Sequence, residues 1–280
     1  MKFQTLIVSS FFKKNKKYLS DFVNSINDQS DQKFDILLTL DKSNYSFYLK
    51  KLEKKNRKII ILKERLPIKL NKFNILKKIR ALDYQNIILQ DSDDTCNKDR
   101  VKITNNLLKK NNFIVGDLII NKKKIFSKYL KNNQKLNISN LLNGNVAGFG
   151  NTAFKKKIIT ENRLKKIAKI PNDLTAFDWN LWLIFLYDLK KIIFSSQIQI
   201  NYNTSSSSLT SLSRVDLSKF KENIEVNCET FLNVSNINKK YLSRYNYILE
   251  NYINCDKKNF YKKFELFKKK YKKVWFYLPS

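Results

Sequence analysis

The most constraining feature of the sequence is a short apolar run, Asn86 to Gln90, that ends abruptly in the acidic stretch Asp91-Ser92-Asp93-Asp94. The run has strand length and no helical period, so it predicts a strand buried on both faces of a mostly parallel sheet. Open α/β folds bind their ligands at the carboxyl ends of such strands. Carboxylates crowded this closely repel one another, which indicates a positive partner between them. A divalent metal that carries a diphosphate fits, since hard cations take oxygen ligands and bridge phosphates.

Other acidic loops share part of this pattern. An EF-hand loop needs glycine where Cys96 stands and an acid where Lys102 stands, so the sequence excludes it. A haloacid-dehalogenase phosphatase places Asp-x-Asp-x-Thr after an apolar strand, as in Asp91 to Thr95. That motif normally opens its domain, whereas a strand-helix-strand unit precedes it here, so the phosphatase is the second choice. An acidic turn without chemistry is the simplest alternative, and it would be preferred if no other signal accompanied the stretch.

The composition limits the classes of partner and of chemistry. The 280 residues include 55 Lys and Arg against 24 Asp and Glu, which gives a net charge of +31. The excess is mostly Lys spread along the whole chain, so we discount nucleic acid as a partner and keep a basic binding module as the non-enzyme alternative. With no His in the sequence, acid–base chemistry near neutral pH falls to carboxylates, Lys, Tyr or Cys. Three widely separated Cys residues and the absence of a signal-peptide pattern favour a cytoplasmic protein.

Strands and helices are predicted to alternate along the first 200 residues. Thr5 to Ser9 predicts a first strand, residues 19–26 an amphipathic helix capped by Ser20 or Asp21, and Phe34 to Leu40 a second strand that ends at Asp41. The later pattern predicts strands over 59–62, 113–120 and 191–200 and helices over 71–82 and after Pro171. This alternation is typical of an α/β fold. From about residue 211, Lys- and aromatic-rich helices are expected.

The opening unit resembles the family-2 glycosyltransferases, which have the GT-A fold. The likeness is carried by Ser9-Ser10-Phe11-Phe12, Tyr18-Leu19, Ser25-Ile26, Gln29 and the strand that ends at Asp41. It implies that Ser9 and Phe11 lie at the nucleotide, that Phe11 stacks on the base, and that Asp41 accepts a hydrogen bond from the base. Since this chain has Ser for the usual Pro and Phe12 for the usual Asn, Phe12 is an alternative stacking ring.

The acidic stretch resembles the metal motif of the same family, in which Asp-x-Asp-Asp is followed by Asp-Arg at the start of a helix, here Asp99-Arg100. The resemblance implies that Asp91 and Ser92 contact the nucleotide and that Asp91 helps to order the metal. It implies that Asp93 binds Mn²⁺ or Mg²⁺ directly. The family carries an Arg that touches the diphosphate in the preceding segment, where the candidates are Lys72, Lys78 and Arg80.

Two later segments complete the expected site. Three of the 4 glycines fall within residues 143–151, which suggests unusual backbone angles or the close approach of a ligand. The resemblance places Gly148 and Phe149 at the donor sugar and the acceptor. It also matches Asp178 to the catalytic base, between Phe177 and Trp179, with Trp179 on the sugar side. A carboxylate that only serves the helix dipole is the alternative for Asp178.

These features predict a GT-A-like α/β catalytic domain over residues 1–210, with a nucleotide-binding half (1–95) and an acceptor half (96–210). A helical extension is expected over 211–280. The resemblance implies an inverting, metal-dependent glycosyltransferase that moves a sugar from a nucleotide-diphosphate donor, of UDP type by preference, to an acceptor hydroxyl. We expect a glycan or lipid-linked acceptor in surface polysaccharide or glycolipid synthesis. The basic C-terminal helices are expected to contact the inner membrane surface peripherally.

Overall fold

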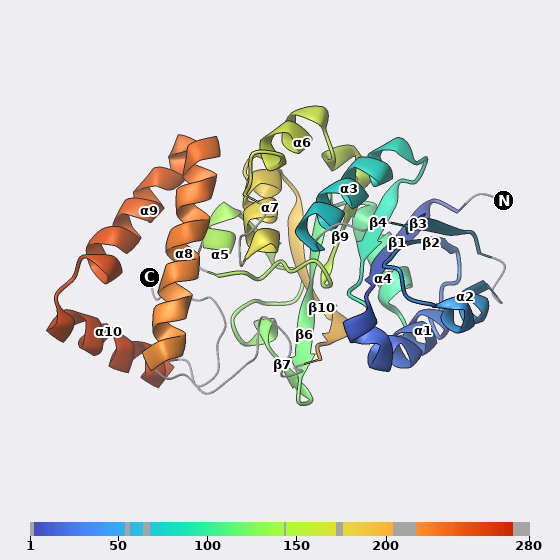
Figure 1. Cartoon of the computed structure of the whole chain (residues 1–280), viewed down its shortest axis with the longest axis horizontal. Coiled ribbons are helices and arrows are strands. Elements are labelled where there is room, and N and C mark those ends of the chain that lie inside the picture. Colours follow the sequence, from blue (N-terminus) through green and yellow to red (C-terminus); the bar gives the residue numbers. More distant parts are fainter. Residues whose placement is uncertain are drawn as a thin grey trace. The chain divides into compact units, whose positions relative to one another are not determined.

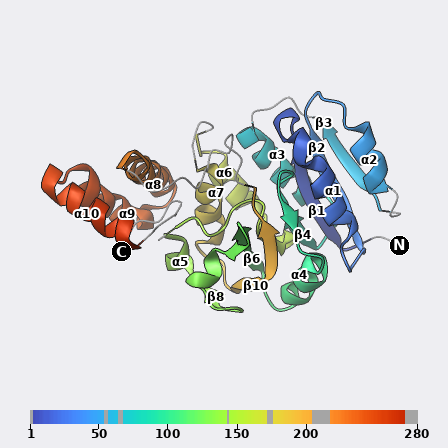
Figure 2. The same ribbon diagram turned by 90° about the horizontal axis from the view of Figure 1, so that it is seen from below.

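The computed structural model describes residues 3–53, 57–63, 68–142, 144–171, 176–203 and 217–270. The chain groups into two compact units. Unit 1 comprises residues 1–136, 147–164 and 188–203, and unit 2 comprises residues 137–146, 165–187 and 204–280. Unit 1 is a sheet with helices on both faces, and unit 2 is helical (Figures 1 and 2). The domain boundary predicted near residue 210 lies outside the described residues.

Unit 1 is organised around a mixed sheet, ten-stranded among the described residues, with the order β3-β2-β1-β4-β9-β6-β10-β5 along its main path. The strands β3, β2, β1 and β4 run parallel, β9 is antiparallel to both of its neighbours, and β6 and β10 are again parallel. The bounds on this path are β1 (Thr5–Phe11), β2 (Phe34–Leu40), β3 (Ile59–Lys63), β4 (Asn86–Leu89), β5 (Thr95–Cys96), β6 (Phe113–Ile120), β9 (Thr152–Lys155) and β10 (Ile192–Asn201). The short strands β7 (Lys123–Lys124) and β8 (Lys135–Leu136) pair with β6 and β10.

Different helices cover the two faces of the parallel strands. Alternate residues of β2, beginning with Phe34, join a hydrophobic cluster with side chains of α1 (Leu19–Asn27), α2 (Ser46–Glu53) and α4 (Arg100–Leu108). The other face meets α3 (Ile68–Ala81), where Asn71 Nδ2 donates to Thr39 Oγ1 at 3.0 Å. Figure 1 shows α3 on the opposite side of these strands from α1 and α2. Because both faces are covered, every residue of β2 is buried, Asp35 and Thr39 included.

The segment between β1 and α1 is ordered differently from the prediction. A 3₁₀ helix, η1 (Lys13–Tyr18), leads directly into α1, and the N-cap residue Tyr18 makes no side-chain capping hydrogen bond. Ser20 and Asp21 lie inside α1, so neither of them caps it. The Lys-rich turn is therefore a defined element that follows the carboxyl end of β1.

Unit 2 is helical, and its interior contains a cluster of aromatic rings. Its helices are the last three residues of α6 (Glu161–Ile167) and the whole of α5 (Ile138–Leu142), α7 (Phe177–Leu186), α8 (Leu217–Ile237), α9 (Leu242–Ile248) and α10 (Lys257–Lys270), with the turns η4 (Lys239–Tyr241) and η5 (Leu249–Ile253). Phe220 on α8 lies at ring-centroid distances of 5.0 to 6.3 Å from Tyr252, Phe260, Phe264 and Phe267. None of the helices within the described ranges is long and apolar enough to cross a membrane.

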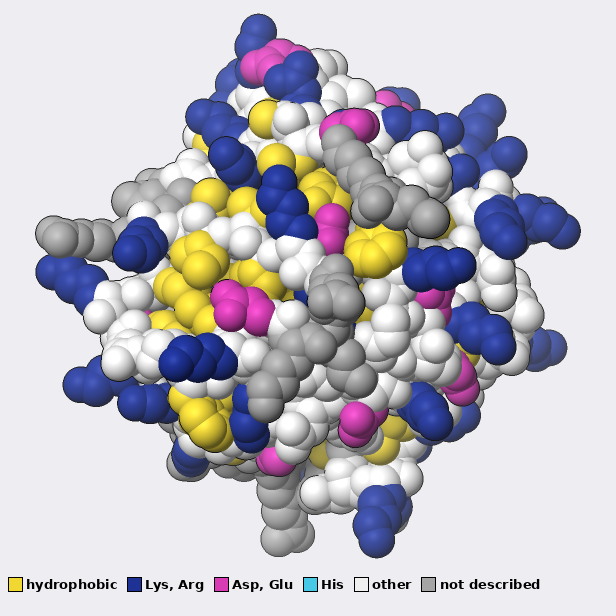
Figure 3. All heavy atoms as spheres, turned by 90° about the vertical axis from the view of Figure 1, so that its right-hand side faces the viewer, with side chains coloured by type: hydrophobic (Ala, Val, Ile, Leu, Met, Phe, Trp, Pro, Cys, Tyr) yellow, Lys and Arg dark blue, Asp and Glu magenta, His cyan; other side chains and the backbone are white. Residues whose placement is uncertain are grey.

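The positive charge of the chain is dispersed. Figure 3 shows Lys and Arg side chains around the whole of the face that it presents, with acidic side chains and uncharged surface between them. Overall charge therefore marks no single place on this face as a site.

Candidate functional site

The acidic stretch lies where the strand order of the sheet reverses. β1 pairs with β2 on one side and with β4 on the other, and Val8 of β1 stands opposite Leu89 of β4. The chain leaves β1 toward β2, whereas the strands that follow β4 lie on the other side of it. Open α/β sheets bind ligands at such a reversal, beyond the carboxyl ends of the strands. Asp91 to Asp94 follow β4 at this point, as the sequence predicted.

Residues of η1 donate hydrogen bonds to side chains that follow the carboxyl ends of β2 and β4. The backbone N–H of Lys13 donates to Asp41 Oδ2 at 2.7 Å, and Asn15 Nδ2 donates to Ser92 Oγ at 3.2 Å. Asp41 and the acidic turn after β4 therefore border the same six-residue element. Asn15 was not anticipated from the sequence, because nothing in a Lys-rich turn singles out an Asn.

Asp41 is fixed by three donors. Besides the N–H of Lys13, its Oδ1 accepts hydrogen bonds from the N–H of Ser43 and the hydroxyl of Tyr45, each at 2.8 Å. Burial alone would raise the pKa of Asp41, but these hydrogen bonds outweigh it and hold the pKa below its usual range. These contacts hold the ionised Asp41 carboxylate beside η1.

The acidic turn holds three carboxylates close together. Asp94 is buried, and burial followed by the charges of Asp91 and Asp93 raises its pKa well above the usual range, although the N–H of Asn203, at 2.8 Å, opposes this. Burial also raises the pKa of Asp93, against its own backbone N–H and the charges of Lys14 and Lys72. Asp91 and Asp93 are both partly exposed. The turn thus concentrates negative charge at the surface, with two lysines facing it.

Arg100 supplies a buried positive charge behind this turn. It is 2% exposed, and its Nη2 donates to the carbonyl oxygens of Leu89 at 2.6 Å and Gly150 at 2.9 Å. Burial lowers the pKa of Arg100, while the charges of Asp91 and Asp94 favour the cation. The sequence identified Arg100 only as part of the Asp-Arg pair at the start of α4. Its link to Gly150, 50 residues away, has no local signal.

Of the three basic candidates on α3, Lys72 is the one whose charge acts on the acidic turn. Its Nζ lies 4.8 Å from the ring centroid of Phe149, and it is one of the two lysines that oppose the raised pKa of Asp93. Arg80 instead forms an ion pair with Glu161 on α6, and Lys78 is exposed. Lys14 on η1 is the second lysine whose charge acts on Asp93, and it was not among the residues predicted from the sequence.

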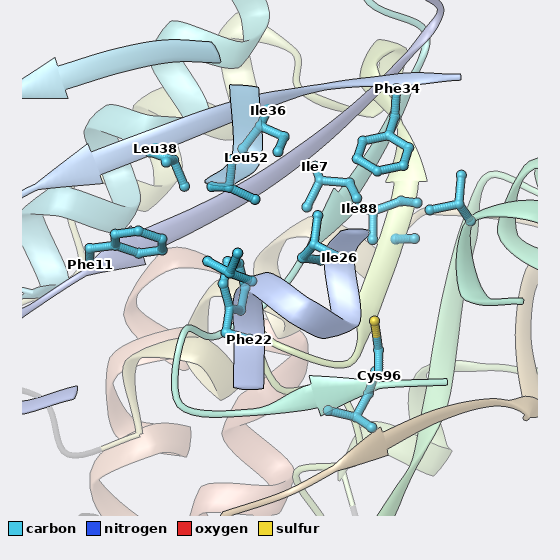
Figure 4. Close-up of a cluster of buried hydrophobic side chains, with 14 of the residues drawn as sticks. Ile7, Phe11, Phe22, Ile26, Phe34, Ile36, Leu38, Leu52, Ile88 and Cys96 are labelled. Atoms are coloured by element: carbon cyan, nitrogen blue, oxygen red, sulfur yellow. The ribbon is translucent and has the colours of Figure 1, made fainter. Parts of the chain in front are cut away.

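Two residues predicted at the nucleotide, Phe11 and Ser9, are buried, and their roles stay predictions. Phe11 is 0% exposed, and its ring packs against Phe22 and Tyr45 at centroid distances of 5.5 Å (Figure 4). Ser9 is likewise fully buried in β1. The physical reason is that β1 runs to Phe11 and not to Ser9, so both side chains remain within the sheet and its core. Of the two rings considered, only Phe12 keeps exposed surface.

Three more predicted contacts lie in buried surroundings. Trp179 is 0% exposed and donates from Nε1 to the carbonyl oxygen of Leu141 at 2.7 Å within unit 2. Phe149 is buried, with Lys72 over its ring. Their predicted places at the sugar stay predictions. Ser92 is buried with Asn15 on its hydroxyl. Gly148 is partly exposed, as is Asp178 in the first turn of α7; their roles stay predictions.

The residues at the turn suit a hard divalent cation, although they do not form a complete cage. Within the described part of the chain, no group of three or more His, Cys, Asp or Glu side chains is arranged to hold a metal ion. Asp91 and Asp93 nevertheless offer partly exposed carboxylate oxygens that repel each other and Asp94. Mg²⁺ and Mn²⁺ are commonly held by one or two carboxylates, with phosphate and water oxygens as the other ligands. The donor set therefore fits Mn²⁺ or Mg²⁺ together with a diphosphate.

A mostly parallel sheet with an acidic turn at its strand-order reversal, followed by C-terminal helices, is a GT-A-like fold, which confirms the predicted fold class. S. aureus TarS 1-349 superposes with a TM-score of 0.60 and 13% identity, covering 88% of this chain and 71% of that chain. The same TarS fragment in complex with UDP-GlcNAc superposes with a TM-score of 0.59 and 16% identity, covering 87% of this chain and 72% of that chain. Mannosyltransferase PcManGT from Pyrobaculum calidifontis, in complex with GDP-Man and Mn²⁺, superposes with a TM-score of 0.56 and 10% identity. The match covers 89% of this chain and 70% of that chain.

The family follows from the sequence itself. The family model described as glycosyl transferase family 2 matches residues 5–168, which is more than half of the chain. The chain therefore belongs to glycosyl transferase family 2, and the phosphatase and binding-module alternatives give way to an enzyme of this family. No curated protein sequence matches it. Against a longer TarS chain, the match covers 91% of this chain but only 44% of that one.

Proposed function

We propose that this protein transfers a sugar from a nucleotide-diphosphate donor to an acceptor hydroxyl, with inversion at the anomeric carbon. The observation that carries the proposal is the meeting of Asp41, the acidic turn, Lys14 and Lys72 around η1 at the strand-order reversal. Family membership supports glycosyl transfer. Proteins of the same fold were crystallised with UDP-GlcNAc and with GDP-Man, which supports nucleotide sugars as donors and UDP-type donors as the first to test.

Each group at this edge has a role in donor binding. The Asp41 carboxylate would accept a hydrogen bond from an N–H of the base, and Phe12 is the nearby ring with exposed surface. Asp91 would contact the ribose, and Lys14 and Lys72 would pair with the diphosphate oxygens. Asp93, assisted by Asp91, would hold the divalent cation. When bound, the cation neutralises charge on the leaving diphosphate.

The proposed chemistry is a single in-line displacement. Asp178 takes the proton of the acceptor hydroxyl as that oxygen bonds to the anomeric carbon. The bond from that carbon to the diphosphate oxygen breaks, and its electron pair leaves with the nucleotide diphosphate, so the configuration inverts. A general base contributes about 10²- to 10⁴-fold, and alignment of the two substrates contributes much of the remainder.

We further propose a glycan or lipid-linked acceptor, in surface polysaccharide or glycolipid synthesis at the cytoplasmic face of the membrane. α10 supports this, because it exposes Tyr261 and Leu266 among Lys257, Lys258, Lys262 and Lys268. Each Lys near an anionic bilayer contributes about 1 kcal/mol to binding. Sedimentation with vesicles tests this directly. Binding is expected with anionic phospholipid, and equal binding to neutral vesicles, or none to either, would reject it.

A donor screen tests the main proposal. UDP-, GDP- and dTDP-linked sugars are titrated by calorimetry with Mn²⁺, with Mg²⁺ and with EDTA. Donors that bind are then incubated with glycan and lipid-linked acceptors, and the anomeric configuration of the product is read by NMR. We expect metal-dependent binding of one class of donor and an inverted linkage. Failure of every nucleotide sugar to bind would overturn the proposal, and a retained configuration would remove the single displacement.

A further inference from the structure

A Cβ atom on Gly150, in the turn before β9, would overlap the Asp91 carboxylate, so one of the two would have to shift. A Cβ atom built on Gly150 would lie 2.6 Å from Asp91 Oδ2, 3.1 Å from its Cγ and 3.2 Å from its backbone nitrogen. Real Cβ atoms essentially never approach other heavy atoms within 3.0 Å. None of the described glycines has a positive φ, so Gly150 is required for space and not for an unusual backbone angle.

Arg100 prevents the Gly150 backbone from moving away. Its Nη2 donates to the carbonyl oxygens of Gly150 and Leu89, so a single buried nitrogen joins the turn before β9 to the end of β4. Hydrogen bonds from a charged group in the interior are among the stronger ones, and breaking them leaves a buried cation short of acceptors. The same guanidinium acts electrostatically on Asp91. Gly150 therefore lies against the Asp91 side chain, and Arg100 holds together the two segments that carry Gly150 and Asp91.

The other glycines with described surroundings differ from Gly150. A Cβ on Gly116 would lie 2.6 Å from Ile198 Cγ2, an apolar contact in the hydrophobic cluster. A Cβ on Gly148 would meet only Asn151 Oδ1, at 3.3 Å. Gly150 is thus the one of these three that abuts a predicted site carboxylate, and Gly116 offers a control with the same degree of overlap against a different neighbour.

We propose that Gly150 and Arg100 are positioning residues that set the orientation of the Asp91 carboxylate for the donor. Gly150 leaves the space that the carboxylate occupies, and Arg100 fixes the Gly150 carbonyl while placing positive charge behind the turn. This inference rests on the proposed function, since it concerns how the same site keeps its shape. It gives Gly150 a role that its residue type alone does not reveal.

A double-mutant cycle tests the coupling. Gly150→Ala is made in the natural sequence and in an Asp91→Ala background, and Gly116→Ala is made in the same two backgrounds as the control. The readouts are the thermal midpoint without ligand, the affinity for UDP with Mn²⁺, and kcat/KM. In the natural sequence we expect Gly150→Ala to lower the thermal midpoint, to weaken UDP about tenfold and to lower kcat/KM on the order of 10²-fold, as a misplacement of about 1 Å does.

In the Asp91→Ala background the main overlap is gone, so Gly150→Ala is expected to change the thermal midpoint and UDP affinity little. Gly116→Ala is expected to lower the midpoint equally in both backgrounds. If the effects of Gly150→Ala are also equal in both backgrounds, Gly150 has only a packing role and the proposal is overturned. The proposal is also overturned if Gly150→Ala, made in the natural sequence, leaves UDP affinity and kcat/KM unchanged.

A second variant covers the case in which Gly150→Ala does not fold. Arg100→Lys keeps the charge on a side chain that is one atom shorter, so its Nζ does not reach the position from which Nη2 donates to both carbonyl oxygens. We expect it to weaken UDP several-fold while Mn²⁺ is still required, and unchanged UDP affinity in a folded Arg100→Lys protein would overturn the inference. If the natural protein binds no nucleotide with metal, the proposed function has failed. The ligand-free midpoints would still show whether Gly150 acts through Asp91.

Discussion

The two units of this protein bury different kinds of side chain. In unit 1, the region behind the acidic turn buries Ser92, Asp94 and Arg100. In unit 2, the described buried side chains carry no charge, and large aromatic rings such as Phe220 and Trp179 are among them. Buried charge costs stability unless its partners are in place, whereas buried aromatic rings contribute stability directly. The contrast teaches that unit 1 gives up stability to build a site, while unit 2 contributes stability and, through Asp178, one predicted chemical group.

Removing that one group should have the largest effect. Asp178→Asn is expected to lower kcat on the order of 10³-fold, because the acceptor hydroxyl loses its base. UDP affinity in the presence of Mn²⁺ should stay the same, since Asp178 is not assigned to the donor. Steady-state kinetics and calorimetry measure the two quantities. Asp256→Asn, at an exposed acid of the same unit, is the control. Transfer at the natural rate by Asp178→Asn would remove unit 2 from the chemical step.

Unit 2 should lose stability when its aromatic centre is removed. Phe220→Ala deletes a fully buried ring that contacts four others, and such changes cost about 3 to 5 kcal/mol. Urea unfolding followed by the fluorescence of the buried Trp179 and Trp182 measures the loss. Phe220→Leu fills part of the space and should lose less. An effect below about 1 kcal/mol for Phe220→Ala would contradict the account of unit 2 as an aromatic core.

The lysines of unit 1 should affect donor binding and not turnover. Lys72→Ala removes a charge that acts on Asp93 and is assigned to the diphosphate, so KM for the donor should rise about tenfold. Arg80→Ala, on the same helix but paired with Glu161, is the matched control and should leave KM unchanged. A larger rise in KM for Arg80→Ala than for Lys72→Ala would assign the diphosphate contact to Arg80 instead of Lys72.

The smallest effect concerns Asp41 and acid stability. Hydrogen bonds lower the folded-state pKa of Asp41, so its ionised form contributes stability above the unfolded-state value of about 3.9. That contribution is lost as the pH falls through the lower, folded-state value. Asp41→Asn should therefore lower the thermal midpoint at pH 7, and the difference from the natural protein should shrink below about pH 4. A difference that stays constant from pH 7 to pH 3 would show that the charge of Asp41 is not what holds η1.

The sequence predicted those parts of the fold that depend on local patterns. The segment Phe34 to Leu40 is β2 with the predicted bounds, and the run before Asp91 is β4. The helix α4 after Asp99-Arg100 is the one that the family resemblance implied. These strands follow from apolar content and strand length, which tertiary packing did not override here. The placement of acids at the carboxyl ends of two parallel strands followed from the same pattern.

The sequence did not predict contacts that depend on element ends or on distant segments. β1 extends by two residues beyond Ser9, and this shift turns Phe11 from a surface ring into a core ring. Trp179 resembled a sugar contact beside Asp178, but a helix that is apolar on all sides buries it. The support that Arg100 and Gly150 give to Asp91 joins segments far apart in the chain, and one sequence contains no signal for it.

The central claim is that the edge formed by Asp41, η1 and the acidic turn binds a nucleotide diphosphate together with a divalent cation. Calorimetric titration of UDP into the natural protein, Asp93→Ala and Asp178→Asn, each with Mn²⁺ and with EDTA, tests it most directly. The account predicts Mn²⁺-dependent binding that Asp93→Ala loses and Asp178→Asn keeps. Binding of equal strength with Mn²⁺ and EDTA, or an equal loss in both variants, would contradict it.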